Sequence, residues 1–254
     1  MYHKSNKIHP SVIIIGDVKV GQNNIIEPNV ILSGNITIGN GNLIGDNCVF
    51  KNQVNIGDNN KFIGNCSIGT PGEMGSKGDV VDKDSSVLIG NNNTFREYIT
   101  INFPVRRDRT IIGNNCYCMA RTHIAHDCIL KDNVVMATNS LIGGGTIVNK
   151  YAYIGLASIT HQWVDIGESA MIGLQAANTK HILPFCIVTG IPSRILKFNR
   201  VGAERRGYSS DILNEIDNNF REIINGDYST DNPIIKVINE FKDKYDKFLT
   251  NFLK

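Results

Sequence analysis

The sequence predicts a mainly β protein, a parallel β-helix with a small helical domain after it, and two observations lead to this prediction. Apolar residues recur at six-residue intervals along most of the chain between Ile8 and Ile172, and Gly, Asn and Asp gather in the positions after them. Neither the helical period of 3.6 nor the strand period of 2 explains that spacing. A six-residue repeat is typical of a parallel β-helix in which three repeats form one triangular coil. We expect the β-helix over residues 1–190 and a connector with an α-helical domain over 191–254.

Within the predicted β-helix, the repeat begins at Ile8 and is interrupted twice. It breaks for an insertion over residues 70–88 and for a second over residues 102–111, and it returns in register after each. Each hexad's apolar residue is expected to point inward, and the Gly and Asn residues after it suit turns with positive φ. Thr160 is the first polar residue at an inward position. Residues 18 apart should therefore stack in columns, about 4.8 Å apart.

The cysteines fit this scheme as small core residues. Cys48, Cys66, Cys116 and Cys128 lie four positions after a hexad's apolar residue, and Cys118 takes the apolar position itself. The chain has no CxxC pair, so neither a disulfide nor a structural metal site is favoured.

The C-terminal region reads as a basic connector and two helices. One helix is expected between the cap at Ser209 and the stop at Gly226, and the other starts with Pro233 at its first position. Their apolar stripes would cover the open end of the last coil or mediate oligomerisation.

Composition excludes some functions. The net charge is +2, which is too small for a nucleic-acid-binding footprint over the whole protein. No apolar run approaches the roughly 18 residues of a membrane span, and the first residues lack the apolar core of a signal peptide. We therefore expect a cytoplasmic protein with no membrane span and no nucleic-acid partner.

The segment Arg121–Cys128, RTHIAHDC, carries the candidate chemistry. The 18-residue stacking places a base, amide and indole donors and a cation along one edge of the prism, which predicts an outward-facing groove. The two columns of that edge are His126, Gly144, Gln162 and Lys180, and beside them Asp127, Gly145, Trp163 and His181, with His123 and His161 alongside.

Three interpretations of these histidines stay open on residue types alone. His126 with Asp127 supplies a general base and a carboxylate that fixes its tautomer. A zinc site needs three or four ligands, and within one chain the spacing is poor, although histidines of two subunits could share a metal, as in β-helix carbonic anhydrases. A non-catalytic scaffold with turn histidines is the third.

RTHIAHDC, the Gly143–Gly145 turn, THQW and the NRVGAERRGYS segment resemble the UDP-N-acetylglucosamine acyltransferases of lipid A biosynthesis over nearly the whole chain. The resemblance implies a left-handed β-helix and a homotrimer with active sites between subunits. It also implies acyl transfer from a thioester carrier to a nucleotide sugar, without a bound cofactor or metal. Acyl length would be set by a side chain that blocks the groove between subunits, with Met171, Ile172, Leu174 and Met136 as candidates.

The resemblance assigns roles residue by residue. It implies that His126 is the general base, that Asp127 orients it and that the Gly144 N–H supports the oxyanion. The substrate-binding residues would be His123, Gln162, His161, Asn102, Glu97 and Asp84. The residues that bind the acyl carrier would be Gly173, Lys180, Asn199, Arg205 and Arg206.

Several positions depart from that family's pattern. The first insertion lacks its Gln-Asp-Leu-Lys-Tyr-like run, INFPVRRDR replaces its His/Asn-Arg-Gly segment, Gly145 stands at a common histidine, and HQW replaces HQF. We interpret these departures as favouring a sister group, which transfers an acyl group from acyl-CoA to the amino group of a dTDP-linked amino-deoxysugar for O-antigen and other cell-surface glycans. The alternative is the O-acyltransferase of lipopolysaccharide (lipid A) biosynthesis, which uses UDP-N-acetylglucosamine and acyl carrier protein.

Overall fold

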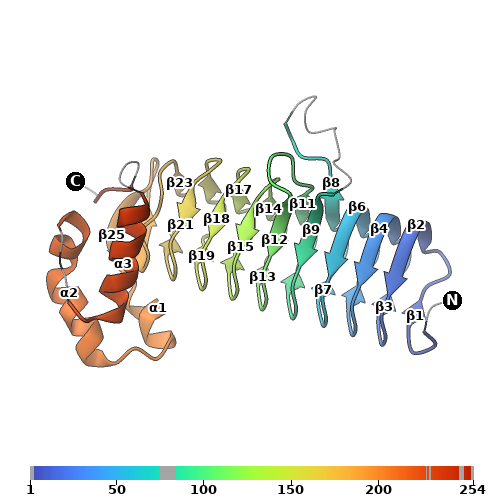
Figure 1. Cartoon of the computed structure of the whole chain (residues 1–254), viewed down its shortest axis with the longest axis horizontal. Coiled ribbons are helices and arrows are strands. Elements are labelled where there is room, and N and C mark those ends of the chain that lie inside the picture. Colours follow the sequence, from blue (N-terminus) through green and yellow to red (C-terminus); the bar gives the residue numbers. More distant parts are fainter. Residues whose placement is uncertain (1–2, 75–83, 227, 229, 246–248, 253–254) are drawn as a thin grey trace.

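The computed structural model describes residues 3–74, 84–226, 228, 230–245 and 249–252. It is a left-handed parallel β-helix, elongated along the coil axis, with helices at its C-terminal end (Figure 1). The predicted fold class is therefore confirmed. No helix in these described ranges is long and apolar enough to cross a bilayer.

The first face of the prism is a single ladder of parallel strands that ends in one antiparallel pair. Its strands are β1 (Lys7–Ile8), β3 (Ile25–Ile26), β5 (Leu43–Ile44), β7 (Lys61–Phe62), β10 (Thr94–Phe95), β13 (Tyr117–Cys118), β16 (Val135–Met136), β19 (Tyr153–Ile154), β22 (Met171–Ile172), β24 (Cys186–Thr189) and β25 (Arg194–Phe198). Pairing follows the 18-residue register, so that Val135 lies beside Tyr153 and Tyr153 lies beside Met171.

The other two faces share one sheet, because the first strands bend around the corner between them. These long strands are β2 (Ile13–Val20), β4 (Ile31–Ile38) and β6 (Val49–Ile56), and β6 pairs with a strand of each face. The second face continues as β8 (Ser67–Thr70), β11 (Thr100–Asn102), β14 (His123–Ile124), β17 (Leu141–Ile142), β20 (Ile159–Thr160) and β23 (Ala177–Asn178). The third continues as β9 (Ser86–Ile89), β12 (Arg109–Ile112), β15 (Ile129–Leu130), β18 (Ile147–Val148) and β21 (Asp165–Ile166).

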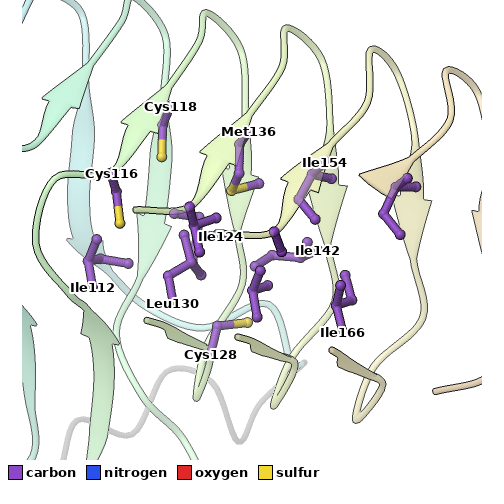
Figure 2. Packing of buried hydrophobic residues seen from close by; sticks show 14 of the residues in the cluster. Ile112, Cys116, Cys118, Ile124, Cys128, Leu130, Met136, Ile142, Ile154 and Ile166 are labelled. Carbon is purple, nitrogen blue, oxygen red and sulfur yellow. The ribbon is translucent and has the colours of Figure 1, made fainter. Parts of the chain in front are cut away.

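The core is a column of the inward residues that the repeat predicted (Figure 2). Ile124, Leu130, Met136 and Ile142 have no exposed surface. The six cysteines are free and buried. Burial raises the pKa of the Cys116 thiol to about 11 and that of Cys128 to about 12, so both are uncharged fillers at neutral pH.

Polar residues also enter the core in an ordered way. Asn24, Asn42 and Asn60 are buried, and the side-chain oxygen of each accepts hydrogen bonds from the asparagine of the next coil, a ladder that ends at Asn93. At the other end, Asn178 Nδ2 donates to the hydroxyl of the buried Thr160 at 3.1 Å. These bonds satisfy groups that would otherwise be costly to bury.

The C-terminal region contains the two expected helices, α2 (Ser210–Asn225) and α3 (Pro233–Lys244), and one more. The short helix α1 (Arg200–Arg205) lies in the segment interpreted from sequence as a connector. Its N-cap is Asn199, whose side chain accepts from the Gly202 N–H and donates to Ser169 O at 2.9 Å. The cap therefore ties α1 to the β-helix.

Candidate active site

One corner of the prism, between the second and third faces, carries both insertions into the β-helix. Both insertions leave the prism there, the first between β8 and β9 and the second between β11 and β12. The turn with His126 occupies the same corner in the next coil, between β14 and β15. Figure 1 shows the chain after β8 and after β11 rising from this edge beside β14. The three segments are neighbours because each belongs to a successive coil.

The predicted columns are present at this corner. Gly145 N donates to His126 O at 2.9 Å, and Trp163 N donates to Gly144 O at 2.9 Å. The chain passes through left-handed backbone conformations here, with φ of +65° at Asp127 and +61° at Trp163. A turn that fixes such angles sets the direction of the side chains on either side.

His126 and Asp127 form a hydrogen-bonded pair. His126 Nδ1 lies 2.7 Å from Asp127 Oδ2. Because an ionised carboxylate only accepts hydrogen bonds, Nδ1 of the neutral imidazole carries the proton and Nε2 keeps its lone pair. An imidazole in this tautomer is suited to take a proton at Nε2.

The pair is more enclosed than the predicted outward groove. His126 is 7% exposed and Asp127 is fully buried. A Cβ added to Gly72 of the first insertion would lie 2.9 Å from His126 Cβ, so the backbone of that loop packs directly on the imidazole. The reason for the difference is that Gly72 of the first insertion and residues Val105–Arg107 of the second pack over the corner, which the regular repeat does not predict.

The second insertion surrounds the Asp127 carboxylate with donors. The backbone N–H groups of Val105, Arg106 and Arg107 donate to Asp127 Oδ1 at 2.8 to 3.0 Å. Burial alone would raise the pKa of this carboxyl, but the hydrogen bonds from His126 and from these three N–H groups outweigh it and hold the pKa below its usual value. Asp127 is therefore ionised at neutral pH.

Gly144 lies against the imidazole in the next coil. A Cβ there would be 2.5 Å from His126 Cε1 and 2.7 Å from Nε2, so only glycine fits beside this face of the ring. Among the described residues, the Gly144 N–H donates to no protein acceptor. A free N–H next to a general base is the arrangement that an oxyanion needs.

The expected substrate-binding residues are distributed over the second face. His123 is half-buried, with Nδ1 2.7 Å from Thr100 Oγ1, and burial, opposed by Glu73, lowers its pKa. Asn102 is buried and donates to Pro71 O at 3.2 Å, and its Oδ1 has no partner within the described ranges. His161 and Gln162 are exposed further along the corner.

Two expected substrate residues lie apart from this group. Glu97 occupies the opposite edge of the second face, before β11, where it pairs with Arg96 at 2.8 Å. Asp84 lies just before β9 and is exposed. Of the other acidic residues of the first insertion, Asp79 and Asp82 fall outside the described residues, whereas Glu73 is described and exposed.

The expected carrier-binding residues do not form one group. Asn199, Arg205 and Arg206 line a cavity of about 850 Å³ between α1 and the first face, together with Tyr151 and Tyr153. Arg206 stacks over the Tyr151 ring at 4.4 Å and pairs with Glu168. Gly173 and Lys180 are not among the residues lining this cavity.

His181 belongs to another cluster. Its ring stacks on Tyr245 at 4.1 Å, and its Nδ1 accepts the Asp165 N–H. It therefore contacts the C-terminal segment rather than His126. Within the described part of the chain, no three His, Cys, Asp or Glu side chains are placed to hold a metal ion.

Comparison with known proteins gives the family. Residues 182–254 match a family model described as UDP N-acetylglucosamine O-acyltransferase, domain 2. The chain is 33% identical over 172 residues to the acyl-[acyl-carrier-protein]–UDP-N-acetylglucosamine O-acyltransferase of Campylobacter concisus, and 35% identical over 158 residues to that of a Synechocystis strain. These matches cover 67% and 62% of this chain, but only 65% and 56% of the two relatives.

Solved structures extend the likeness to both ends of the chain. A UDP-N-acetylglucosamine acyltransferase from Campylobacter jejuni superposes with a TM-score of 0.89 at 28% identity, covering 98% of this chain and 100% of that one. An enzyme of the same name from Francisella novicida, at 24% identity and a TM-score of 0.77, shares the fold and covers 97% of this chain and 87% of that one.

These findings correct the function expected from the sequence departures. The expectation of acyl-CoA-dependent N-acylation of a dTDP-linked amino sugar is wrong, because the relatives are named as O-acyltransferases of UDP-N-acetylglucosamine that use acyl carrier protein. The names of these relatives support neither acyl-CoA as the acyl donor nor a role in O-antigen biosynthesis. The departures lie in loops around a site whose scaffold is retained. The chain belongs to the UDP-N-acetylglucosamine acyltransferase family of left-handed, hexapeptide-repeat β-helix proteins.

Proposed function

We propose that this protein transfers an acyl group from acyl carrier protein to a hydroxyl group of UDP-N-acetylglucosamine. The observation that carries the proposal is the His126–Asp127 pair beside the Gly144 N–H, on a scaffold that matches an acyltransferase over nearly its whole length. The donor and acceptor come from the names of the relatives.

In the proposed reaction, His126 Nε2 takes the proton of the attacking sugar hydroxyl. The oxygen then attacks the thioester carbonyl, and the Gly144 N–H donates to the oxyanion of the tetrahedral intermediate. As the C–S bond breaks, the imidazolium returns its proton to the leaving thiolate. Asp127 keeps the imidazole in the reactive tautomer and stabilises its charged form.

His123, Gln162, His161 and Asn102 would bind the sugar nucleotide, because they extend from the catalytic corner over the second face. The unpartnered Asn102 Oδ1 is an acceptor for a donor that enters there. Glu97, at the opposite edge of the second face, and Asp84, just before β9 of the third face, stay proposals.

The cavity beneath α1 would hold a phosphate-bearing part of one substrate, away from the reacting groups. Arg205 and Arg206 bring positive charge to it, and Asn199, Tyr151 and Tyr153 supply polar groups. This chemistry suits a nucleotide phosphate or the phosphopantetheine of a carrier protein. Gly173 and Lys180 are proposed as further contacts to the acyl carrier outside the cavity.

A homotrimer would bring the two parts together, because the catalytic corner and the cavity lie on different faces of one prism. Exposed apolar residues on the second face, Leu141 at 41% and Ile159 at 51%, are suited to pack on a neighbouring subunit. We therefore propose that each active site lies between two subunits.

Burial narrows the choice of residue that sets acyl length. Met136 and Ile172 have no exposed surface and fill the core, so neither reaches a groove outside the prism. Met171 and Leu174 are 37% and 67% exposed and are the remaining candidates.

The test is thiol release from 3-hydroxyacyl carrier proteins of several chain lengths with UDP-N-acetylglucosamine. We expect release by the wild-type chain, an O-acylated sugar nucleotide by mass spectrometry, and loss of about 10³-fold with His126→Ala. His9→Ala, which changes an exposed histidine of the first coil, is the matched control and should retain activity.

A parallel reaction supplies short-chain acyl-CoA and a dTDP-linked amino sugar. No product is expected from it. Turnover of UDP-N-acetylglucosamine that is equal in wild type and His126→Ala would refute the role of the histidine, and absence of turnover with every carrier-bound chain would refute the proposed reaction.

A further inference from the structure

The second insertion has a feature that the repeat does not require. Its residues 103–108 run from β11 to β12 over the catalytic corner, and three successive backbone N–H groups point to one carboxylate. Arg106 N also lies 3.1 Å from the second oxygen, Oδ2, which is the oxygen that binds His126. Consecutive N–H groups that converge in this way make a concave anion-binding site.

The side chain of Arg107 holds this segment in place at two points. Its Nη1 donates to the backbone carbonyl of Asp127 at 2.6 Å, and its guanidinium lies 5.0 Å above the Trp163 ring. An Arg guanidinium is suited to such a position, because it stacks flat and donates in its own plane. Arg106, the neighbouring residue, is exposed and offers only its backbone to Asp127.

Trp163 is able to lie there because Gly145 leaves room for it. A Cβ at Gly145 would come within 2.4 Å of the Trp163 ring. The insertion, Gly145 and Trp163, three of the positions that depart from the family pattern, thus meet around Asp127.

We propose that the segment Val105–Arg107, pinned by the Arg107 guanidinium on Trp163, is a positioning element that fixes the Asp127 carboxylate and through it the orientation and tautomer of His126. This inference rests on the proposed function of His126 as general base. Arg107 is a positioning residue in it, since it acts through Asp127 and not on the substrate.

Among the described residues, few charged or titratable groups face Asp127. They are His126, the Arg107 guanidinium and the buried thiol of Cys128. The Asp127 N–H donates to Thr110 Oγ1 at 2.9 Å, so the insertion's far end also holds the residue. Loosening the segment removes N–H donors and admits water, and the hydrogen bond to His126 Nδ1 is then no longer fixed in length or direction.

The experiment compares Arg107→Ala with Arg106→Ala, two adjacent substitutions that keep every backbone N–H. The readouts are the ¹⁵N shifts of His126, which report the tautomer without substrate, and the pH profile of kcat/KM. For Arg107→Ala we expect a mixture of tautomers, an acid limb displaced to lower pH because Asp127 then stabilises the imidazolium less, and a fall of about 10²-fold in kcat with little change in KM. Arg106→Ala should match the wild type in all three.

A third variant tests the donors themselves. Arg106→Pro deletes one N–H that Arg106→Ala retains, and it should reproduce the effect of Arg107→Ala on the tautomer. If Arg107→Ala does not fold, the comparison of Arg106→Pro with Arg106→Ala still tests whether the N–H donors fix the tautomer of His126. A single Nδ1–H tautomer in Arg107→Ala, or in Arg106→Pro, overturns the inference.

The spectra also separate this inference from the proposed function. A wild-type chain that shows the Nδ1–H tautomer but no acyl transfer would remove the proposed reaction and leave the positioning element standing. Acyl transfer that is unaffected by Arg107→Ala would leave the reaction and remove the positioning element.

Discussion

At the scale of single residues, the periodicity of the sequence placed His126 and Asp127 correctly in their columns but did not show how the pair is enclosed. His126, Gly144 and Gln162 could be aligned from 18-residue spacing alone, because a coil repeats its geometry. Arg107 and Gly72 could not be assigned to the site, since insertions follow no period and their closure over Asp127 depends on contacts with other coils. In the sequence, the only indication that a loop covers Asp127 was the INFPVRRDR segment, which interrupts the repeat.

Gly144→Ala is the sharpest test at this scale. The new methyl group would overlap the His126 ring, so the imidazole must turn away from the substrate. We expect kcat to fall by about 10²-fold with the fold retained, measured by thiol release and circular dichroism. Gly226→Ala is the matched control, because its Cβ would meet nothing closer than 3.1 Å, and its activity should be unchanged. Full activity of Gly144→Ala would contradict the close packing of this glycine on the base.

At the scale of elements, the repeat predicted the strands and the caps predicted α2 and α3, but α1 was missed. The sequence of α1 is only six residues long and contains Gly202, so its propensity is weak. It forms because Asn199 caps it and bonds to Ser169 of the β-helix, which is a tertiary effect. The cavity with Tyr151 and Tyr153 was missed for the same reason.

The ladder of buried asparagines leads to a prediction about the stability of the β-helix. In the wild type, Asn42 Oδ1 accepts from Asn60 N at 2.8 Å and from Asn60 Nδ2 at 3.1 Å. Asn42→Leu would leave the buried Asn60 N–H without its acceptor and would leave Asn60 Nδ2 with Gly90 O alone, so we expect the free energy of unfolding to fall by about 2–3 kcal/mol. Urea titration at one fixed protein concentration measures it. Asn35→Ala, on the exposed side of β4, should have almost no effect, and a similar loss in both variants would argue against the ladder.

The attachment of the C-terminal end of α3 to the β-helix gives a prediction on pH. Tyr245 donates to the Asp165 carboxylate, and Lys244 lies 3.3 Å from it. Burial raises the pKa of Asp165 despite the opposing charges of Lys244 and His181. The folded protein then holds this proton to higher pH than the unfolded chain, so the contribution to stability is full below the ordinary aspartate pKa and is lost as pH rises through the folded value.

Asp165→Asn should therefore flatten the dependence of unfolding free energy on pH above about 4, because the amide still accepts from Tyr245 but does not ionise. Chemical unfolding at a series of pH values between about 4 and 8 measures the slope. Asp243→Asn, an exposed carboxylate on the same helix, is the control and should leave the slope as in the wild type. An unaltered slope in Asp165→Asn would assign the pH dependence to other groups.

At the scale of the whole molecule, the fold followed from the sequence more completely than the reaction did. Six-residue periodicity is a property of every coil and survives local change, so the prism could be predicted from Ile8 onward. The choice between a dTDP-linked amino sugar and UDP-N-acetylglucosamine rested on a few loop positions, among them Gly145 and Trp163. In the structure Trp163 lies beneath the Arg107 guanidinium and Gly145 leaves room for Trp163. Under our proposal, the identity of these two residues reports on how His126 is held and not on which sugar binds.

The same scale gives the last prediction, which concerns assembly. In an isolated chain, the side chain of Ile159 on β20 is 51% exposed and lies beside the column that carries the candidate sugar-binding residues. Ile13 on β2 has a similar exposure of 49% but lies in the first coils, far along the prism from that column. If subunits meet through the second face, Ile159→Arg buries a charge in the interface and separates them, because an unpaired charge there costs several kcal/mol. We expect native mass spectrometry to show trimers for the wild type and Ile13→Arg, and monomers for Ile159→Arg, with acyl transfer lost together with the trimer. An active monomer of Ile159→Arg would show that a single prism holds the whole site.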